Sequence, residues 1–267
     1  MTPSSPTRIC LCSLALFGGI VVAGAAHGAD LTVKEVIGRL TQSTPARVAD
    51  FAGLDLSYLD LSDIDFRRAN LAGADLFGSD LSRANLSGAN LSRARLDRTI
   101  IIGTNFADAN LTHASLLRPA AFSSFDVRAD EAPRFAGADL SGGHVFGRFS
   151  GGDWRGANLA AVRMGAGRSE RELLSRTDLA DCDLSGANLA GADLAGALLA
   201  FADLTNADLS SANLNGVDLS RADLTGANLT GANLAGADLD GTILKNVTGL
   251  DRASGLEAAR NRTKAID

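Results

Sequence analysis

A five-residue period runs through most of this 267-residue chain, and it limits the possible folds more than any other feature. From Leu179 a Leu recurs at every fifth position as far as Leu244, and a small residue, usually Ala, stands two positions before it. An earlier array keeps the same spacing from Leu56 to Leu116, with Phe or Ile at some of these positions. We call the recurring large apolar residue the centre of each repeat. A repeat of this regularity has to be explained before helices or strands are assigned.

A period of five fits neither common element of secondary structure. On an α-helix, a step of five residues rotates the side chain by about 140°, so the centres form no stripe. On a flat strand, an odd period places successive centres on opposite faces. The pattern is explained if the chain turns once in every repeat. The centre and the small residue then point inward, and Asp, Asn, Ser and Gly face solvent or form the corner.

The repeat can be written as small, Asp or Asn, Leu or Phe, polar, Gly-like, and residues 222–239, ADLTGANLTGANLAGADL, show it most clearly. This pattern resembles the pentapeptide repeat family. The resemblance implies an all-β fold, a right-handed quadrilateral β-helix in which four repeats make one coil and the centres stack as interior ladders. We expect short helical caps to cover the two ends, because a terminal coil otherwise exposes strand edges and apolar side chains.

Residues 1–29 differ from the rest and are typical of a signal peptide. Arg8 is followed by an apolar run and then by small residues, and we expect cleavage after Ala29. This predicts a periplasmic or secreted protein without a stable membrane span after cleavage. The alternative is an uncleaved N-terminal membrane anchor. Cleavage removes Cys10 and Cys12 and leaves Cys182, so no internal disulfide can form.

The repeat pattern divides the rest of the chain. Pro119 and Pro133 lie in a segment where the repeat is interrupted, and the later centres follow a different register. The predicted segments are an N-terminal cap at 30–52, a first array at 53–118, an interruption with a register shift at 119–148, a second array at 149–247 with a bulge near 165–176, and a C-terminal cap or tail at 248–267. The interruption is interpreted as a break within one solenoid, or alternatively as a bend between two stacks.

The sequence offers little reactive chemistry. After the signal peptide, His113 and His144 are the only His residues, and neither has a companion at a spacing typical of a metal site or a catalytic pair. Cys182 stands two positions before a centre, which predicts a buried and unreactive thiol. Trp154 is itself a centre and is expected in the core. We therefore predict no enzyme activity, no cofactor and no metal.

One locally basic region departs from the repeat. Ser169 and Glu172 have the spacing of a helix capping box within it, which indicates a helical turn in the bulge. Its basic residues, a candidate interaction patch for an anionic glycan, a lipid head group or an acidic protein, are Arg148, Arg155, Arg163, Arg168, Arg171 and Arg176. The alternative interpretation is a solvated bulge with no binding role.

The net charge of −6 and the many Asp residues before the centres predict an acidic rod. We expect an exported, non-catalytic structural or protein–protein interaction scaffold with a protein partner and no nucleic acid, which could dimerise through a terminal cap. The alternative, suggested by members of the family that protect type II topoisomerases, is a DNA-mimicking topoisomerase-binding protein in the cytoplasm. Export would separate the chain from a cytoplasmic topoisomerase.

Overall fold

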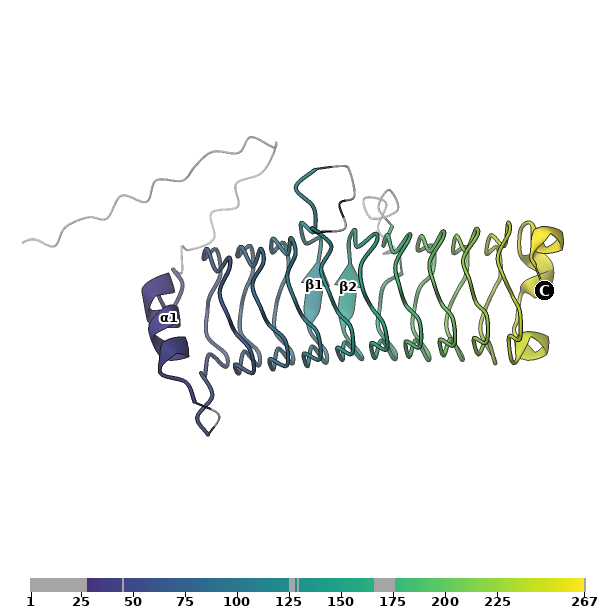
Figure 1. The fold of residues 1–267 in the computed structure, drawn as a ribbon. Helices are drawn as coiled ribbons and strands as arrows, with labels where there is room; N and C mark the ends of the chain where they lie inside the picture. Colours follow the sequence, from purple (N-terminus) through teal and green to yellow (C-terminus); the bar gives the residue numbers. More distant parts are fainter. Residues whose placement is uncertain (1–27, 45, 125–127, 129, 166–175, 267) are drawn as a thin grey trace, which may run out of the picture.

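The structure, a computed structural model, describes residues 28–44, 46–124, 128, 130–165 and 176–266. Most of the predicted signal peptide and most of the predicted bulge, with its capping box, lie outside the described residues. Figure 1 shows the described chain as a stack of similar coils, with the helix α1 (Val33–Thr41) at one end and short helical turns at the other.

The coils are held together by parallel backbone pairing at intervals of 20 residues. Asp183 pairs with Asp203, for example, and Asp203 pairs with Asp223. The residue just before each centre makes this pairing, so a coil has four sides. We name them by their residues in the first coil: side A begins at Asp50, side B at Asp55, side C at Asp60 and side D at Asp65. Four repeats per coil are what the family resemblance predicted.

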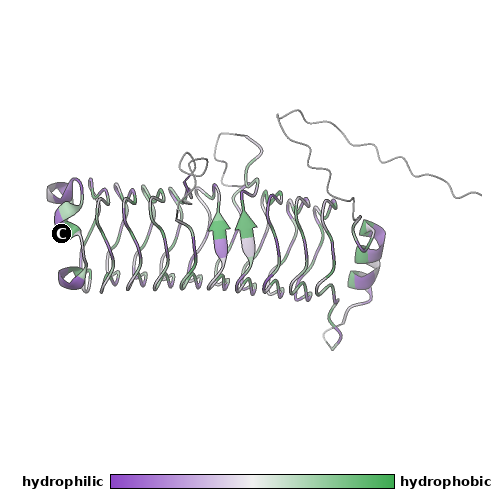
Figure 2. Ribbon diagram, turned by 180° about the vertical axis from the view of Figure 1, so that it is seen from behind, coloured by the Kyte–Doolittle hydropathy of each residue, from purple (hydrophilic) through white to green (hydrophobic). Residues whose placement is uncertain are grey.

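The core is a continuous apolar column inside the coils. Leu204 and Leu209 are fully buried, and Ala202 and Ala207 two positions before them are 1% exposed. The inward direction of the centre and the small residue is thus confirmed. Polar and apolar residues alternate along every coil in Figure 2 because two of five residues face inward and the others face solvent. Burial of these side chains is the main favourable contribution to folding.

Each corner is built from two local features. In the regular repeats, the second residue after the centre has a positive φ, as at Gly186 (66°) and Asp181 (57°), and glycine adopts this conformation without steric cost. The Asp or Asn before the centre accepts a hydrogen bond from the backbone N–H two residues later, as Asp203 does from Thr205 at 2.9 Å. This side-chain turn explains why Asp and Asn recur at that position.

The interruption of the repeat is accommodated within one continuous stack. The strand β1 (Ser115–Leu117) pairs in parallel with β2 (His144–Phe146), across the loop that interrupts the repeat (Figure 1). Asn105 pairs with Arg134, 29 residues later, so the chain loops out between regular sides. The next register change has a different cause. The buried centres Val145 and Phe149 lie four residues apart instead of five, so the side between them is one residue shorter.

An aromatic cluster fills the core beside this irregular region. Phe135 stacks between Phe106, with ring centroids 4.9 Å apart, and Trp154, with centroids 4.0 Å apart. Trp154 is fully buried, which confirms its assignment to the core. Gly152 stands in the small position before it, where a Cβ would lie 2.8 Å from Trp154 Nε1. The largest centre of the core is thus matched by a glycine in the same repeat.

At the N-terminal end, the segment predicted to be helical does form α1. Thr32 begins it with a capping box: its side chain accepts from Glu35 N at 3.3 Å, and the Glu35 carboxylate accepts from Thr32 N at 2.7 Å. Val36 is fully buried, and Leu31 and Leu40 pack against the core. The apolar face of α1 thus lies on the first coil.

The C-terminal end differs from the short helix predicted there. Three 3-10 turns follow one another, η1 (Leu250–Arg252), η2 (Leu256–Ala258) and η3 (Arg262–Lys264). They repeat every six residues, and each follows a residue with left-handed backbone, as at Gly249 and Gly255. One added residue per side converts the corner into a 3-10 turn, so this last coil differs from the others.

Candidate functional site

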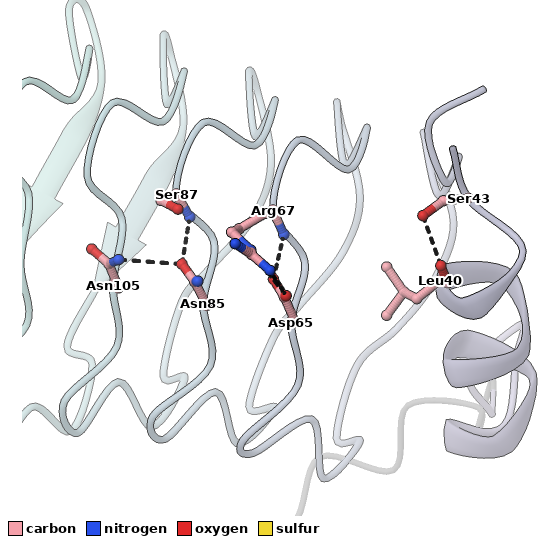
Figure 3. Close-up of polar contacts among 7 residues, drawn as sticks. All are labelled: Leu40, Ser43, Asp65, Arg67, Asn85, Ser87 and Asn105. Atoms are coloured by element: carbon pink, nitrogen blue, oxygen red, sulfur yellow. Dashed lines mark hydrogen bonds and ion pairs between the residues drawn. The ribbon is translucent and has the colours of Figure 1, made fainter. Parts of the chain in front are cut away.

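Asn and Asp form ladders on the solvent-facing surface of side A. The Asn70 amide donates to Asp50 Oδ1 at 2.9 Å, and Asn90 donates to Asn70 Oδ1 at 3.1 Å. Farther along the same side, Asn228 donates to Asp208 Oδ1 at 3.0 Å. Asn is able to donate to the preceding coil and still accept at its own corner. On side D, Asn105 does both: its amide nitrogen donates to Asn85 Oδ1 at 3.2 Å, and its oxygen accepts from Ala107 N at 3.1 Å. Asn85 Oδ1 also accepts from Ser87 N at its own corner (Figure 3). The side-chain hydrogen bonds of these ladders connect each coil to the next.

Side D of the second array carries carboxylates in place of amides. Asp153, Asp183, Asp203 and Asp223 occupy successive coils, and one oxygen of each accepts a backbone hydrogen bond at the corner. No ion pair involves Asp203 or Asp223 within the part of the chain that the structure describes. A carboxylate cannot donate to its neighbour, so this side presents a row of negative charge toward solvent.

Arg155 neutralises the beginning of that row. Its Nη2 lies 2.7 Å from Asp153 Oδ2, and its Nε lies 3.6 Å from Asp183 Oδ2. The hydrogen bond from the Arg155 guanidinium is the largest cause that lowers the pKa of Asp153 below its ordinary value, with a smaller contribution from the backbone N–H of Arg155. Asp153 is therefore ionised over an extended pH range.

The six basic residues of the predicted patch do not all lie together. Arg148 belongs to side C, where its guanidinium lies 5.3 Å from the Phe122 ring centroid, and Arg163 belongs to side B. Arg155 follows side D, as described above, and Arg176 is exposed. Arg168 and Arg171 lie outside the described residues. The structure thus places Arg148, Arg155 and Arg163 on three different sides, and a common binding role for the patch stays a prediction.

Sequence reasoning missed an aromatic and cationic cluster on side B of the first array. Tyr58 is 73% exposed and meets Phe77 edge to face at 5.5 Å between centroids. The Arg95 guanidinium lies 4.2 Å from the Phe77 ring centroid and also pairs with Asp75 and Asp97. Tyr58 and Phe77 occupy solvent-facing corner positions that are small or polar in most repeats, and this departure was the available signal.

The remaining reactive groups are dispersed. Cys182 is buried and donates to the Phe149 carbonyl at 3.1 Å, and burial raises the pKa of its thiol to about 12, which confirms the expected buried thiol. Among the described residues, no three His, Cys, Asp or Glu side chains are close enough to hold a metal ion. In the same residues, no helix has the length and apolar character needed to cross a membrane.

The chain was also compared with solved structures. The chain is 28% identical to HetL of the cyanobacterium Nostoc sp. strain PCC 7120, a pentapeptide repeat protein involved in heterocyst differentiation regulation, over 86% of this chain and 94% of that one, with a TM-score of 0.43. A pentapeptide repeat protein of the Arabidopsis thaliana thylakoid lumen is 37% identical over 37% of this chain and 62% of its own, with a TM-score of 0.33. QnrB1, a plasmid-mediated fluoroquinolone resistance protein, is 18% identical over 78% and 93%, with a TM-score of 0.26.

No curated protein matches the chain by sequence. The model of one family does match, the family described as pentapeptide repeats, with eight copies over residues 49–83, 79–116, 173–210 and 207–246. These segments cover more than half of the chain and include most of both arrays. The fold of such repeats is the right-handed quadrilateral β-helix, in agreement with the four-sided coils. The chain belongs to the pentapeptide repeat family.

Proposed function

We propose that the chain is an exported, non-catalytic scaffold that binds a protein partner through its coil surface. The observation that carries this proposal is the row of carboxylates on side D of the second array. Asp203 and Asp223 stand one coil apart on a backbone fixed by regular pairing, and they have no ion-pair partner in the described residues. A fixed row of like charge attracts a basic surface and gives specificity through its spacing.

The two ends support a scaffold that remains a discrete stack. We infer that α1 caps the N-terminal end and that the 3-10 turns cap the C-terminal end, because both replace the regular strand edge with other structure. Arg260, Arg262 and Lys264 add charge to the last coil, and Asp238 and Asp240 pair with two of these side chains. Charged terminal coils disfavour stacking of one rod on another.

The test combines localisation with an isosteric change of the charged row. The chain is expressed in full, and the periplasmic fraction is analysed by mass spectrometry for a new N-terminus near Ala29. Cross-linking in that fraction is then compared between the natural chain and the double variant Asp203→Asn and Asp223→Asn. Asn retains the corner hydrogen bond and removes the charge.

We expect one basic partner to be cross-linked by the natural chain and lost with the Asn variant. Asn213→Asp on side B is the matched control, because it changes charge on another side. An uncut chain recovered in the cytosol contradicts export. A partner retained equally by both charge variants contradicts the role of side D.

The same row of carboxylates favours a second candidate, the cytoplasmic topoisomerase-binding DNA mimic. A ladder of acids along a rigid rod has the charge sign of a nucleic acid backbone. Purified chain added to a gyrase supercoiling reaction distinguishes the two candidates. Inhibition or protection that is lost in the Asn variant supports the mimic, and unchanged supercoiling together with periplasmic recovery supports the scaffold.

A further inference from the structure

Among the described residues, only two of the four sides at the N-terminal end of the stack are covered. Within the stack, the residue before each centre donates its N–H to one neighbouring coil and accepts at its C=O from the same coil, as Asp75 does with Leu54 and Leu56. The first coil has no preceding coil. On side B, Asp30 replaces it: Asp30 N donates to Asp55 O at 2.7 Å, and Asp55 N donates to the Asp30 carboxylate at 2.7 Å.

Side A receives partial cover, while no described residue covers sides C and D. Arg39 of α1 donates to Asp50 O at 2.9 Å. On the other two sides, the backbone N–H and C=O groups of Asp60 and Asp65 have no hydrogen-bond partner in the described part of the chain. Both residues are exposed. An unpaired strand edge of this kind is able to accept another extended segment.

The open edge at Asp65 borders an apolar groove of about 800 Å³. The groove lies between α1 and side D of the first coil, and Leu40 of α1 points toward the coil that carries Asp65 (Figure 3). Ile37 and Val48 line it and are each 45% exposed. Ile64, next to the unpaired edge, is half-buried at its floor. Apolar side chains and unpaired backbone groups thus face the same space.

We propose that this groove binds an extended segment of a partner protein with the pattern small, Asp, aliphatic, which adds to the edge at Asp65. The inference deepens the proposed scaffold function and rests on it for the existence of a protein partner. The pattern is taken from the molecule itself. Asp30 and Leu31 already bind the neighbouring edge in this way: the Asp30 carboxylate and N–H hold the Asp55 backbone, and Leu31 packs against the core. The small residue two positions before the aliphatic one follows the repeat itself, as Ala202 precedes Leu204.

The charges around the groove favour an acidic segment. Asp65 pairs with Arg67 at 2.6 Å, and Asp63 pairs with Arg83 at 2.6 Å, so both carboxylates at the rim are neutralised. Arg68 also lines the groove and has no acidic partner in the described residues. The rim therefore keeps one unpaired positive charge, which complements the Asp of the incoming segment.

The test uses the full purified chain and a fluorescein-labelled hexapeptide with the sequence GADLTV, which is residues 28–33. Binding is followed by fluorescence anisotropy. Two further probes examine the mode of binding: one is N-methylated at the Asp amide and cannot donate to the edge, and the other has Ala in place of Asp. Ile37→Asp places a charge in the groove on an exposed position of α1. Phe201→Asp is the matched control, because Phe201 is 52% exposed on a distant coil.

We expect saturable binding of GADLTV to the natural chain, weakened at least about tenfold by either probe change or by Ile37→Asp. Phe201→Asp should alter it by less than about twofold. Circular dichroism establishes that each variant is folded. The proposal is overturned if no probe binds, if Ile37→Asp binds as well as the natural chain, or if sedimentation shows a dimer that Ile37→Asp dissociates, since a second copy then occupies the groove. Loss of the cross-linked partner in the periplasm with intact peptide binding contradicts only the scaffold function.

Discussion

The first array, residues 53–118, and the regular part of the second, residues 177–247, share one coil geometry and differ on the outside. The first contains eight Asp and seven Arg, whereas the second contains ten Asp, one Arg and one Lys. Interior ladders are nearly the same in both, with buried centres throughout. The comparison teaches that the repeat specifies the coil, while the solvent-facing positions vary independently and carry what distinguishes one surface from another.

The corners show the same difference in energetic terms. In the first array, nine corners have a non-glycine residue in the left-handed conformation and five have Gly. In residues 177–247, six corners have a non-glycine residue in this conformation and eight have Gly. Each non-glycine residue in this conformation costs about 1–2 kcal/mol. The first array thus accepts more backbone strain and presents Tyr58, Arg98 and His113 at its corners.

The largest expected effect tests whether the two cores are equivalent. Leu91 and Leu209 are both buried centres of side A. Replacement of either by Asp places a charge on an apolar ladder without a partner and should lower the free energy of unfolding by at least about 4 kcal/mol. Hydrogen exchange should show the loss confined to the coils nearest the substitution, because a solenoid is stabilised between neighbours.

Tyr58→Asp provides the control for this pair, since Tyr58 is exposed and should change stability by less than about 0.5 kcal/mol. A much larger effect at Leu209 than at Leu91 would show that the arrays differ inside as well as outside. An unchanged melting temperature in either variant would place that Leu outside the core.

A smaller effect is expected when corner residues are exchanged between the arrays. Arg93 and Gly191 occupy the same corner after side A, with φ of 59° and 65°, and nothing lies within 4 Å of a Cβ built at Gly191. Gly191→Arg should destabilise the chain by about 1 kcal/mol through backbone strain alone. Arg93→Gly should have the opposite sign. Thermal unfolding of both variants measures the difference, and stabilisation by Gly191→Arg would refute the strain argument.

The interior of this fold could be predicted from the sequence because the period of five leaves few alternatives. Leu204 and Cys182 were assigned inward from spacing alone, and both are buried. The C-terminal coil was not predicted, since its period of six spans only three repeats and begins at Gly249, too briefly to be recognised as a pattern. The groove beside α1 could not be predicted either, because it depends on how Ile37 and Ile64 approach each other in space.

The smallest effect concerns one ion pair that both arrays contain at the same position. On side D, Arg67 follows Asp65 and Arg155 follows Asp153 by two residues. The guanidinium hydrogen bond is the largest cause that lowers the pKa of each Asp. A lowered pKa in the folded state contributes stability that is present above the ordinary Asp value of about 3.9 and is lost as the pH falls through the lowered value.

Arg67→Gln and Arg155→Gln should therefore each reduce stability slightly at pH 7 and by less at about pH 2, because protonation of the Asp removes the charge with which the Arg pairs. Urea unfolding at the two pH values measures this. The change should be larger for Arg155, because the Asp153 side chain is 25% exposed and that of Asp65 is 51% exposed, and solvent weakens the more exposed pair. Equal destabilisation at both pH values would mean that the Arg side chains act through packing. The ion pairs of the two arrays would then contribute no charge-dependent stability in either array.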